Sequence, residues 1–440
     1  MSNPIVCNIA RVLMLSLCIA GNATAAPTLE ERLEILQQEI DAIKAQLANQ
    51  PSKQASEKPQ ATTPQQPAQS QSPTVAQAST STASNSSLFG SGNTTVGGYG
   101  EFAYNKYRNT DVNNNQADLR RFVLFLGHRF NDNLRFFSEL EVEHAVASSS
   151  DRGEVELEQA YLDYRINDAV NFKAGLFLMP LGILNETHEP PTYYGVERNF
   201  VETRILPSTW REGGLQLHGE FAQGWKYNAG VTTGFDAGKI DDPAFGIRSG
   251  HQELQLANAN DLSVHGALNY RAPGVLVGGG VFTGNTGQNG ATNAALKGVP
   301  ARLTLWDVHA KYFRGDWDLQ ALYARGTLGD AAQVSNALIA ASGNANLLAP
   351  KVFDGWYTQA AYHVWKRGDM SLTPFIRYEK FNTQKEVADG FTADPLNNER
   401  VITAGLSFRL HPQVVIKADY QKFRTDSTKD RFNLGVGYMF

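Results

Sequence analysis

The sequence predicts an all-β protein: a 16-stranded antiparallel transmembrane β-barrel with an N-terminal coiled-coil helix. Two observations predict the barrel. From residue 94 to residue 440, apolar and polar residues alternate with a period of two, which places successive side chains on opposite faces of a strand. The connections between these strands alternate between short turns and longer loops, as in transmembrane barrels. A heptad pattern near the N-terminus predicts the helix.

Residues 1–25 have the features of a secretory signal peptide. Arg11 precedes an apolar run from Val12 to Ala20, which is too short to cross a bilayer, and Ala23-Thr24-Ala25 forms an A-x-A cleavage site. Both cysteines of the chain lie inside this segment. The exported protein is therefore expected to have no disulfide and no thiol chemistry.

Composition excludes two other classes of protein. The mean hydropathy of the 440 residues is -0.33, whereas a helical membrane protein would contain apolar runs of roughly 20 residues. The 39 Lys and Arg residues are outnumbered by 44 Asp and Glu residues, so no basic face for nucleic acid is expected.

Residues 27–50 predict the coiled-coil helix. The apolar positions are spaced 4, 3, 4, 3 and 4 residues apart, which is the a/d seam of a heptad repeat. These positions are Leu29, Leu33, Leu36, Ile40, Ile43 and Leu47. Packing of the helix on its own barrel is the alternative to self-association. Residues 51–90 are rich in Gln, Ser, Thr, Ala and Pro, and predict a disordered linker.

Residues 94–440 form the predicted barrel domain, and its turns define the strands. Seven short segments carry the Asn, Asp, Gly and Pro residues that tight turns require. They are Asn131-Asp132-Asn133, Asn167-Asp168, Gln223-Gly224, Ala272-Pro273-Gly274, Arg314-Gly315-Asp316, Arg367-Gly368-Asp369 and His411-Pro412-Gln413. Eight longer loops lie between them, near residues 108–115, 147–153, 179–209, 236–259, 284–301, 326–351, 382–398 and 425–428. Seven turns and eight loops connect sixteen strands.

Individual strands show which residues are expected to face lipid. In the segment from 134 to 143, Leu134, Phe136, Leu140 and Val142 share one face, and the opposite face is charged. In the segment from 225 to 235 the predicted outward set is Trp225, Tyr227, Ala229, Val231 and Phe235. The last strand also alternates and ends at the aromatic residue Phe440, as outer-membrane barrels do.

Two stretches give the chain a resemblance to a known family. They run from Gly153 to Gly182 and from Asn199 to Gly214, and they contain Pro180, Gly182, Arg211 and Gly213 at the entry to and exit from the third loop. This pattern resembles the phosphate-selective porin family. The resemblance implies a trimeric 16-stranded barrel in the bacterial outer membrane, whose third loop folds into the lumen.

The third loop, residues 179–209, is expected to form the pore constriction. Pro180, Pro190, Pro191 and Pro207 restrict its backbone, and its charged residues would bias which ions enter. These candidate constriction residues are Glu186, His188, Glu189, Glu197, Arg198, Glu202 and Arg204. An ordinary solvated outer loop is the alternative.

Charged residues on the inward phase of the strands are the candidate pore wall. They are Arg120, Glu139, Glu141, Lys173, Lys226, Arg377, Arg409 and Lys417. Phosphate selection in the resembled family uses an arginine ladder and a lysine cluster, whereas these cations are scattered and face carboxylates. A general porin is therefore favoured over a phosphate-specific one, although small anions such as phosphate remain candidate solutes.

The expected function is a passive channel for small hydrophilic solutes or ions, without a cofactor or metal. Its expected partners are outer-membrane lipid and two further copies in a homotrimer, and no nucleic acid. A structural tether that reaches peptidoglycan through the coiled coil is the alternative function. No enzyme is expected, because His218, His265 and His309 lie on the inward phase and no serine has the context of a nucleophile.

Overall fold

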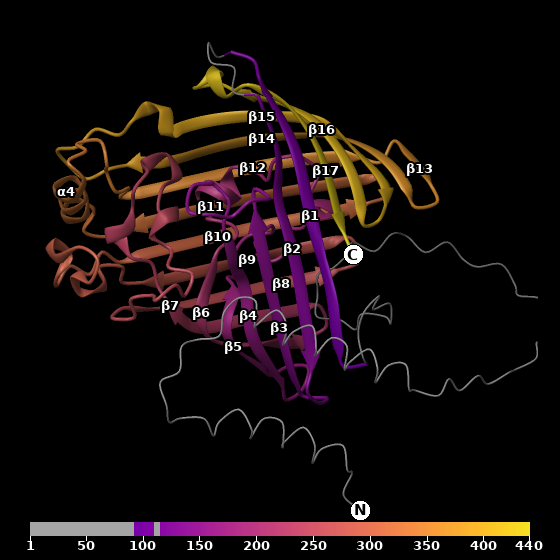
Figure 1. Ribbon diagram of the computed structural model, residues 1–440, viewed down its shortest axis with the longest axis horizontal. Helices are drawn as coiled ribbons and strands as arrows, with labels where there is room; N and C mark the ends of the chain where they lie inside the picture. Colours follow the sequence, from indigo (N-terminus) through magenta and orange to yellow (C-terminus); the bar gives the residue numbers. More distant parts are fainter. Residues whose placement is uncertain (1–91, 110–114) are drawn as a thin grey trace, which may run out of the picture. The chain divides into compact units, whose positions relative to one another are not determined.

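The structure is a computed structural model that describes residues 92–109 and 115–440. These residues form a closed antiparallel β-barrel (Figure 1). The predicted signal peptide, coiled-coil helix and linker lie outside the described residues. None of the helices in the described part of the chain is long and apolar enough to cross a membrane.

The strands follow one another around the barrel in chain order. The first eight are β1 (Thr94–Tyr107), β2 (Gln116–Arg129), β3 (Leu134–Glu143), β4 (Val155–Arg165), β5 (Asn171–Leu178), β6 (Arg211–Ala222), β7 (Trp225–Thr233) and β8 (Leu262–Ala272). The others are β9 (Val275–Gly284), β10 (Leu303–Arg314), β11 (Trp317–Leu328), β12 (Val352–Tyr362), β13 (Trp365–Arg367), β14 (Met370–Glu386), β15 (Asn398–His411), β16 (Val414–Phe423) and β17 (Arg431–Met439).

The barrel has sixteen strand positions, as predicted. β12 and β13 both pair with β14, so they are two parts of one strand interrupted at His363 and Val364. The sheet closes because β1 pairs with β2 on one side and with β17 on the other, with Tyr99 opposite Met439. Closure leaves no open sheet edge. An open edge would expose unpaired backbone N–H and C=O groups to lipid, which is energetically costly.

The turns and loops lie where the alternation placed them. All seven predicted turns join neighbouring strands at one end of the barrel, and the long loops and helix α4 (Ala331–Ser342) gather at the left-hand end in Figure 1. One boundary differs. β14 continues to Glu386, opposite Val352 of β12, where the sequence predicted a loop from residue 382.

The outer face is apolar along the strands. Leu140, Leu162, Val231, Val308 and Leu434 are each between 39% and 53% exposed and face away from the lumen. The prediction for Phe235 was wrong. β7 ends at Thr233, so Phe235 follows the end of the strand and is buried, with its ring 5.2 Å from that of Trp210.

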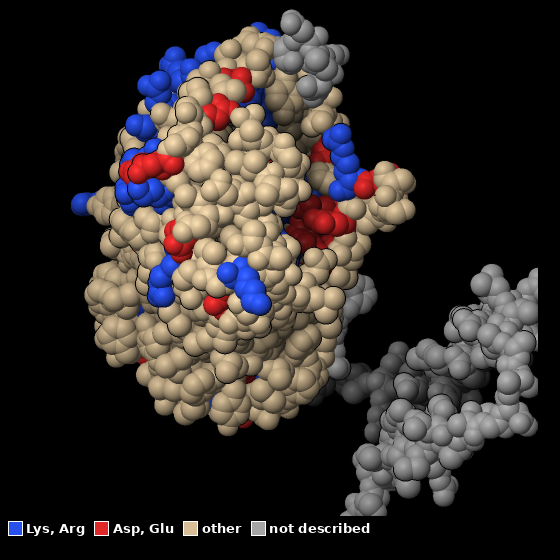
Figure 2. Space-filling view, turned by 90° about the vertical axis from the view of Figure 1, so that its left-hand side faces the viewer, with Lys and Arg blue, Asp and Glu red and all other residues tan. Residues whose placement is uncertain are grey.

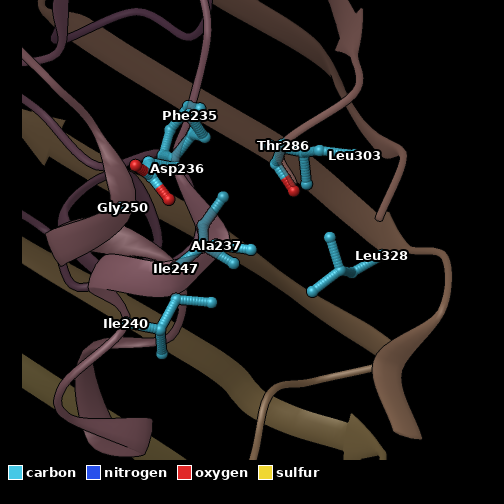
Figure 3. Close-up of a pocket in the computed structure, with 9 residues that line it drawn as sticks. All are labelled: Phe235, Asp236, Ala237, Ile240, Ile247, Gly250, Thr286, Leu303 and Leu328. Carbon is cyan, nitrogen blue, oxygen red and sulfur yellow. The ribbon is translucent and has the colours of Figure 1, made fainter. Parts of the chain in front are cut away.

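An apolar core lies inside the barrel, with most of its members in the loops and on β9 to β12 and others on β4, β5 and β14 to β16. It joins residues of the third and fourth loops to inward-facing residues of β9 to β12, including Trp210, Phe235, Phe282 and Leu305. Figure 3 shows part of this contact, where Phe235, Ala237, Ile240 and Ile247 of the fourth loop face Leu303 and Leu328 of the wall. The loops are therefore packed into the barrel rather than extended into solvent.

An arginine on the outer face is expected to destabilise the barrel. Val308 lies near the middle of β10 and is 53% exposed, so Val308→Arg would place a charge in the hydrocarbon layer. The expected cost is about 2–4 kcal/mol in the free energy of unfolding. Urea unfolding in detergent micelles or vesicles measures it, with Val308→Ala as the uncharged control. Equal stability of the two variants would contradict the outward assignment.

Candidate pore-constriction site

The third loop, residues 179–210 and here called L3, connects β5 to β6 inside the barrel. It begins beside β9, where the amide of Gly182 donates to Asp307 of β10 at 3.1 Å. It then crosses the lumen, and the turn η1 (Pro190–Thr192) lies against β1, β16 and β17. It returns through the short helix α3 (Val201–Arg204), which lies against β12 and β14.

Glycines in the wall make room for L3. A Cβ atom at Gly437 of β17 would lie 2.2 Å from Cβ of Pro190, which two carbon atoms cannot approach. A Cβ atom at Gly280 of β9 would lie 3.0 Å from Cγ of Leu181. Gly280 of β9 and the inward glycines Gly435 and Gly437 of the last strand are therefore contact surfaces for the loop.

Glu202 holds the two ends of L3 together. One carboxylate oxygen accepts from the amides of Ile183 and Leu184 at 2.6 Å each, and the other accepts from Asn199 and from the Tyr357 hydroxyl at 2.8 Å each. The residue is fully buried. The sequence proposed Glu202 as a charge of the constriction, but the structure places it inside the loop, where its charge is satisfied by four donors.

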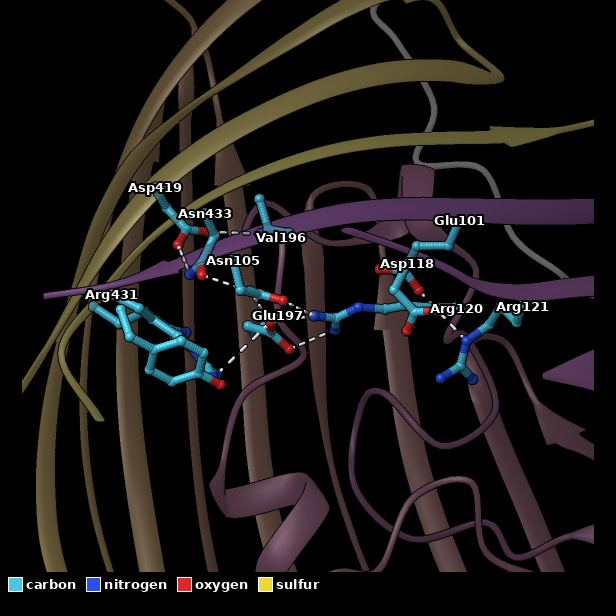
Figure 4. A network of polar contacts seen from close by, with 12 residues as sticks. Glu101, Asn105, Asp118, Arg120, Arg121, Val196, Glu197, Asp419, Arg431 and Asn433 are labelled. Atoms are coloured by element: carbon cyan, nitrogen blue, oxygen red, sulfur yellow. Dashed lines mark hydrogen bonds and ion pairs between the residues drawn. The ribbon is translucent and has the colours of Figure 1, made fainter. Parts of the chain in front are cut away.

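A second contact joins L3 to the wall of β1, β2 and β17 (Figure 4). Arg120 forms a two-pronged ion pair with Glu197, with nitrogen to oxygen distances of 2.5 and 2.6 Å. Asn105 donates to the same carboxylate at 2.9 Å, and Arg431 lies 3.7 Å from it. Burial would raise the pKa of Glu197, but Arg120 and Arg431 outweigh it and hold that pKa well below its usual range.

Three further candidate wall cations hold L3 through its backbone. Lys417 donates to the carbonyl of Gly195 at 2.9 Å and lies 3.5 Å from the centre of the Tyr193 ring. Arg409 donates to the carbonyl of Pro191 at 2.8 Å, and Arg377 reaches that of Glu197 at 3.5 Å. These charges position the loop as well as lining the lumen.

The other two candidate cations lie apart from L3. Lys173 of β5 lies 4.5 Å from the centre of the Tyr161 ring, on the inner wall. Lys226 of β7 is half-buried, and its strand neighbour Asn228 faces Gln216 at 3.2 Å. The three histidines named from sequence also face inward, each beside a carboxylate or an amide: His218 with Asp163, His265 with Gln216 and His309 with Asp307.

Three arginines at L3 and the fourth loop lack a carboxylate partner. Arg198 donates to the carbonyl of His188 at 3.3 Å, Arg248 donates to that of Ser208 at 2.5 Å, and Arg204 stacks on the Phe245 ring at 3.5 Å. Among the described residues, no carboxylate oxygen lies within 4.0 Å of these three guanidinium groups. Burial and the nearby charge of Arg248 lower the pKa of Arg204 to about 10, which leaves it charged at neutral pH.

Carboxylates gather on the wall that β3 and β4 form. Arg121 faces Glu141 at 3.3 Å, and Arg211 faces Glu156 at 2.5 Å. Glu139 is opposite Gln159 while Leu140 is opposite Leu157, so a β-bulge at Glu158 adds an extra inward carboxylate. Figure 2 looks onto the loop end, where acidic side chains collect in a recess near one edge and uncharged atoms cover most of the surface.

His188 carries L3 to this acidic wall. Its Nε2 atom lies 3.4 Å from Glu158 and 3.6 Å from Glu139. Burial alone would lower the pKa of His188, but the two carboxylates outweigh it and raise that pKa to about 10. Of the remaining candidates in L3, Glu189 is buried and Glu186 is exposed.

Sequence reasoning missed several residues of the site. Arg121, Arg248 and Glu253 were not proposed, although Arg121 lies beside Arg120 and could have been identified as a second charge near the same strand end. The two neighbours both reach the lumen because the pairing of β1 with β2 shifts register between Glu101 and Phe102. Such an irregularity is not visible in a pattern with a period of two.

A family model described as "Phosphate-selective porin O and P" matches residues 93–426. The chain belongs to this family. As a porin, it forms a passive channel in the bacterial outer membrane. The family match covers L3 and every strand except β17, and it confirms the family suggested by the sequence resemblance.

Individual proteins are also similar to this porin. A relative from Aquifex aeolicus (strain VF5), described as an uncharacterized protein, is 30% identical over 351 residues, which are 78% of this chain and 79% of the relative. Two solved structures have the same fold with a TM-score of 0.50 each. OmpF of Salmonella typhi is 14% identical and covers 79% of this chain and 98% of its own. The outer membrane channel DcaP of Acinetobacter baumannii is 12% identical, with 79% and 97% covered.

Removal of the Glu202 carboxylate is expected to loosen L3 without opening the barrel. Glu202→Ala would leave the buried amides of Ile183 and Leu184 without acceptors, at about 1–3 kcal/mol each. Single-channel recordings should then show a larger and noisier conductance. Glu186→Ala, in the same loop but exposed, is the control. A conductance identical to wild type would contradict this role.

Proposed function

We propose that the channel passes small hydrophilic ions with a preference for anions, set at L3. The observation that carries this proposal is the group of three arginines, Arg198, Arg204 and Arg248, for which no carboxylate oxygen of the described residues lies within 4.0 Å. Charges without partners in a narrow, partly desolvated passage attract ions of opposite sign more strongly than paired charges do.

The carboxylates near the passage are paired with arginines. The carboxylates of Glu143, Glu156 and Glu253 are 25%, 23% and 28% exposed, and they face Arg121 and Arg211. Because these acids are paired with arginines, their attraction for cations is reduced. The balance at the constriction therefore favours small anions, of which phosphate is one candidate.

Neutralising two of these arginines tests the preference. Arg198→Gln combined with Arg204→Gln should shift the reversal potential in a KCl gradient toward the value for cations. An interaction of about 1 kcal/mol per charge corresponds to roughly a fivefold change in the permeability ratio for each arginine. Arg314→Gln, in an exposed turn at the far end, is the matched control and should change nothing. An unchanged reversal potential in the double variant would refute the proposal.

Phosphate added to the bathing solution in the same recordings tests whether the channel binds phosphate in particular. If phosphate binds at the arginines, millimolar amounts should reduce the chloride current, and the double variant should lose that block. A chloride current unaffected by phosphate would assign the channel to small anions in general.

We infer that the channel is a homotrimer, with the heptads of residues 27–50 contributing to self-association. The apolar outer face and the heptad spacing support this assembly. Native mass spectrometry of the full mature chain should give the mass of three copies, and deletion of residues 27–90 should weaken the assembly. A monomer at every concentration would refute it.

A tether to peptidoglycan rests on the same heptads, and cell-wall pull-down with and without residues 27–50 tests that role.

A further inference from the structure

The buried contact between L3 and the acidic wall has the composition of a metal site. Glu139 of β3, Glu158 of β4 and His188 of L3 place three ligand atoms within 4.8 Å of one another. The three residues are 2%, 0% and 2% exposed. The polar contacts that hold L3 against the other parts of the wall do not involve the side chains of these three residues.

The imidazole is oriented as in metal-bound histidines. Its Nδ1 atom lies 2.9 Å from the carbonyl of Asn185, so Nδ1–H donates there and Nε2 points toward the two carboxylates. Asn185 is itself fixed, because it donates to the carbonyls of Met179 and Trp210 and accepts from the amide of Trp210. Nε2 has no hydrogen-bond partner among residues 92–109 and 115–440.

The carboxylates carry more negative charge than the structure compensates. Neither oxygen of Glu158 has a hydrogen-bond partner, and Glu139 accepts only from Gln159, at 2.7 Å. Within the described residues, His188 is the one cationic group within 4.0 Å of either carboxylate. If both acids are ionised, a charged imidazole leaves one negative charge that no other cation of the described residues balances within 4.0 Å, which is costly in a dry site.

We propose that Glu139, Glu158 and His188 bind one divalent transition-metal ion of the zinc class. Imidazole nitrogen with carboxylate oxygen is a ligand set for such ions rather than for Ca²⁺ or Mg²⁺. Tetrahedral coordination at about 2.0–2.1 Å requires ligand atoms roughly 3.4 Å apart. The distances from Nε2 to the two carboxylates, 3.4 and 3.6 Å, match this requirement.

A row of carboxylates connects the site to the lumen. Glu141, Glu156 and Glu158 also place ligand atoms within 4.8 Å of one another, so Glu158 belongs to both groups. Glu156 is partly exposed, with 23% of its side chain accessible. A cation can thus pass from Glu156 to Glu158, and Glu141 or a water molecule can supply a fourth ligand.

The metal would fasten L3 to the acidic wall. His188 comes from L3, whereas both carboxylates come from the barrel strands β3 and β4. The ion would therefore crosslink L3 to a pair of strands that lies before it in the chain and is not directly connected to it. This crosslink lies on β3 and β4, across from the contacts of L3 with β12 and β14. It would fix the loop that sets the passage.

Metal uptake by the detergent-purified mature protein tests this site. After removal of metals with EDTA, titration with ZnCl₂ should bind one zinc per chain and raise the thermal transition. Co²⁺ in its place should give the visible absorption bands of a tetrahedral nitrogen and oxygen site. Failure of the folded wild-type protein to bind either ion would overturn the proposal and leave a protonated His188 between the two acids.

Variants assign the bound ion to these residues. His188→Gln and Glu158→Gln should each weaken zinc binding by more than about tenfold and abolish the cobalt bands. His218→Gln is the matched control, because His218 is another inward imidazole beside a carboxylate, 3.0 Å from Asp163. Heat-modified migration on gels verifies that each variant is folded. Wild-type affinity in both site variants would place the zinc elsewhere and refute the assignment.

Discussion

The contacts that seat L3 against the inner wall determine what the rest of this porin can do. A barrel of sixteen strands is wide, and without a folded segment inside it would be a water-filled opening with little selectivity. The loop carries polar backbone groups into that space, and each must find a partner. The carboxylate of Glu202, the Arg120–Glu197 pair and the donation from Lys417 supply partners around the loop.

These contacts explain why so many charges of the lumen are already paired. Four cations of the wall already interact with L3, so their charges are partly neutralised by the loop. They are Arg120, Arg377, Arg409 and Lys417. What remains for passing ions is the set of groups that the loop does not use. Within the described residues, the arginines of L3 and the fourth loop that have no carboxylate oxygen within 4.0 Å form one such set, and the carboxylates of β3 and β4 form another.

The interior is therefore divided into two parts with different physical character. On the side of β9 to β12, apolar residues of the loops and the wall exclude water, much as the core of a soluble protein does. On the side of β1 to β4, charged residues face one another across the end of L3. The apolar side fixes the position of the loop, and the charged side decides which solutes can approach it.

The sequence by itself determined the barrel and the number of strands, whereas the position of the third loop inside the barrel was only implied by the family resemblance. A period of two and the turn residues act over a few neighbours, so they can be seen in the chain. The partners of each charge were decided only by the tertiary structure. Glu197 and Arg120 are 77 residues apart, and the amide of Val196 donates to the carboxylate of Asp419 across 223 residues. The bulge at Glu158 and the end of β7 before Phe235 each shift the phase of the pattern, and such shifts depend on pairing with neighbouring strands rather than on local sequence.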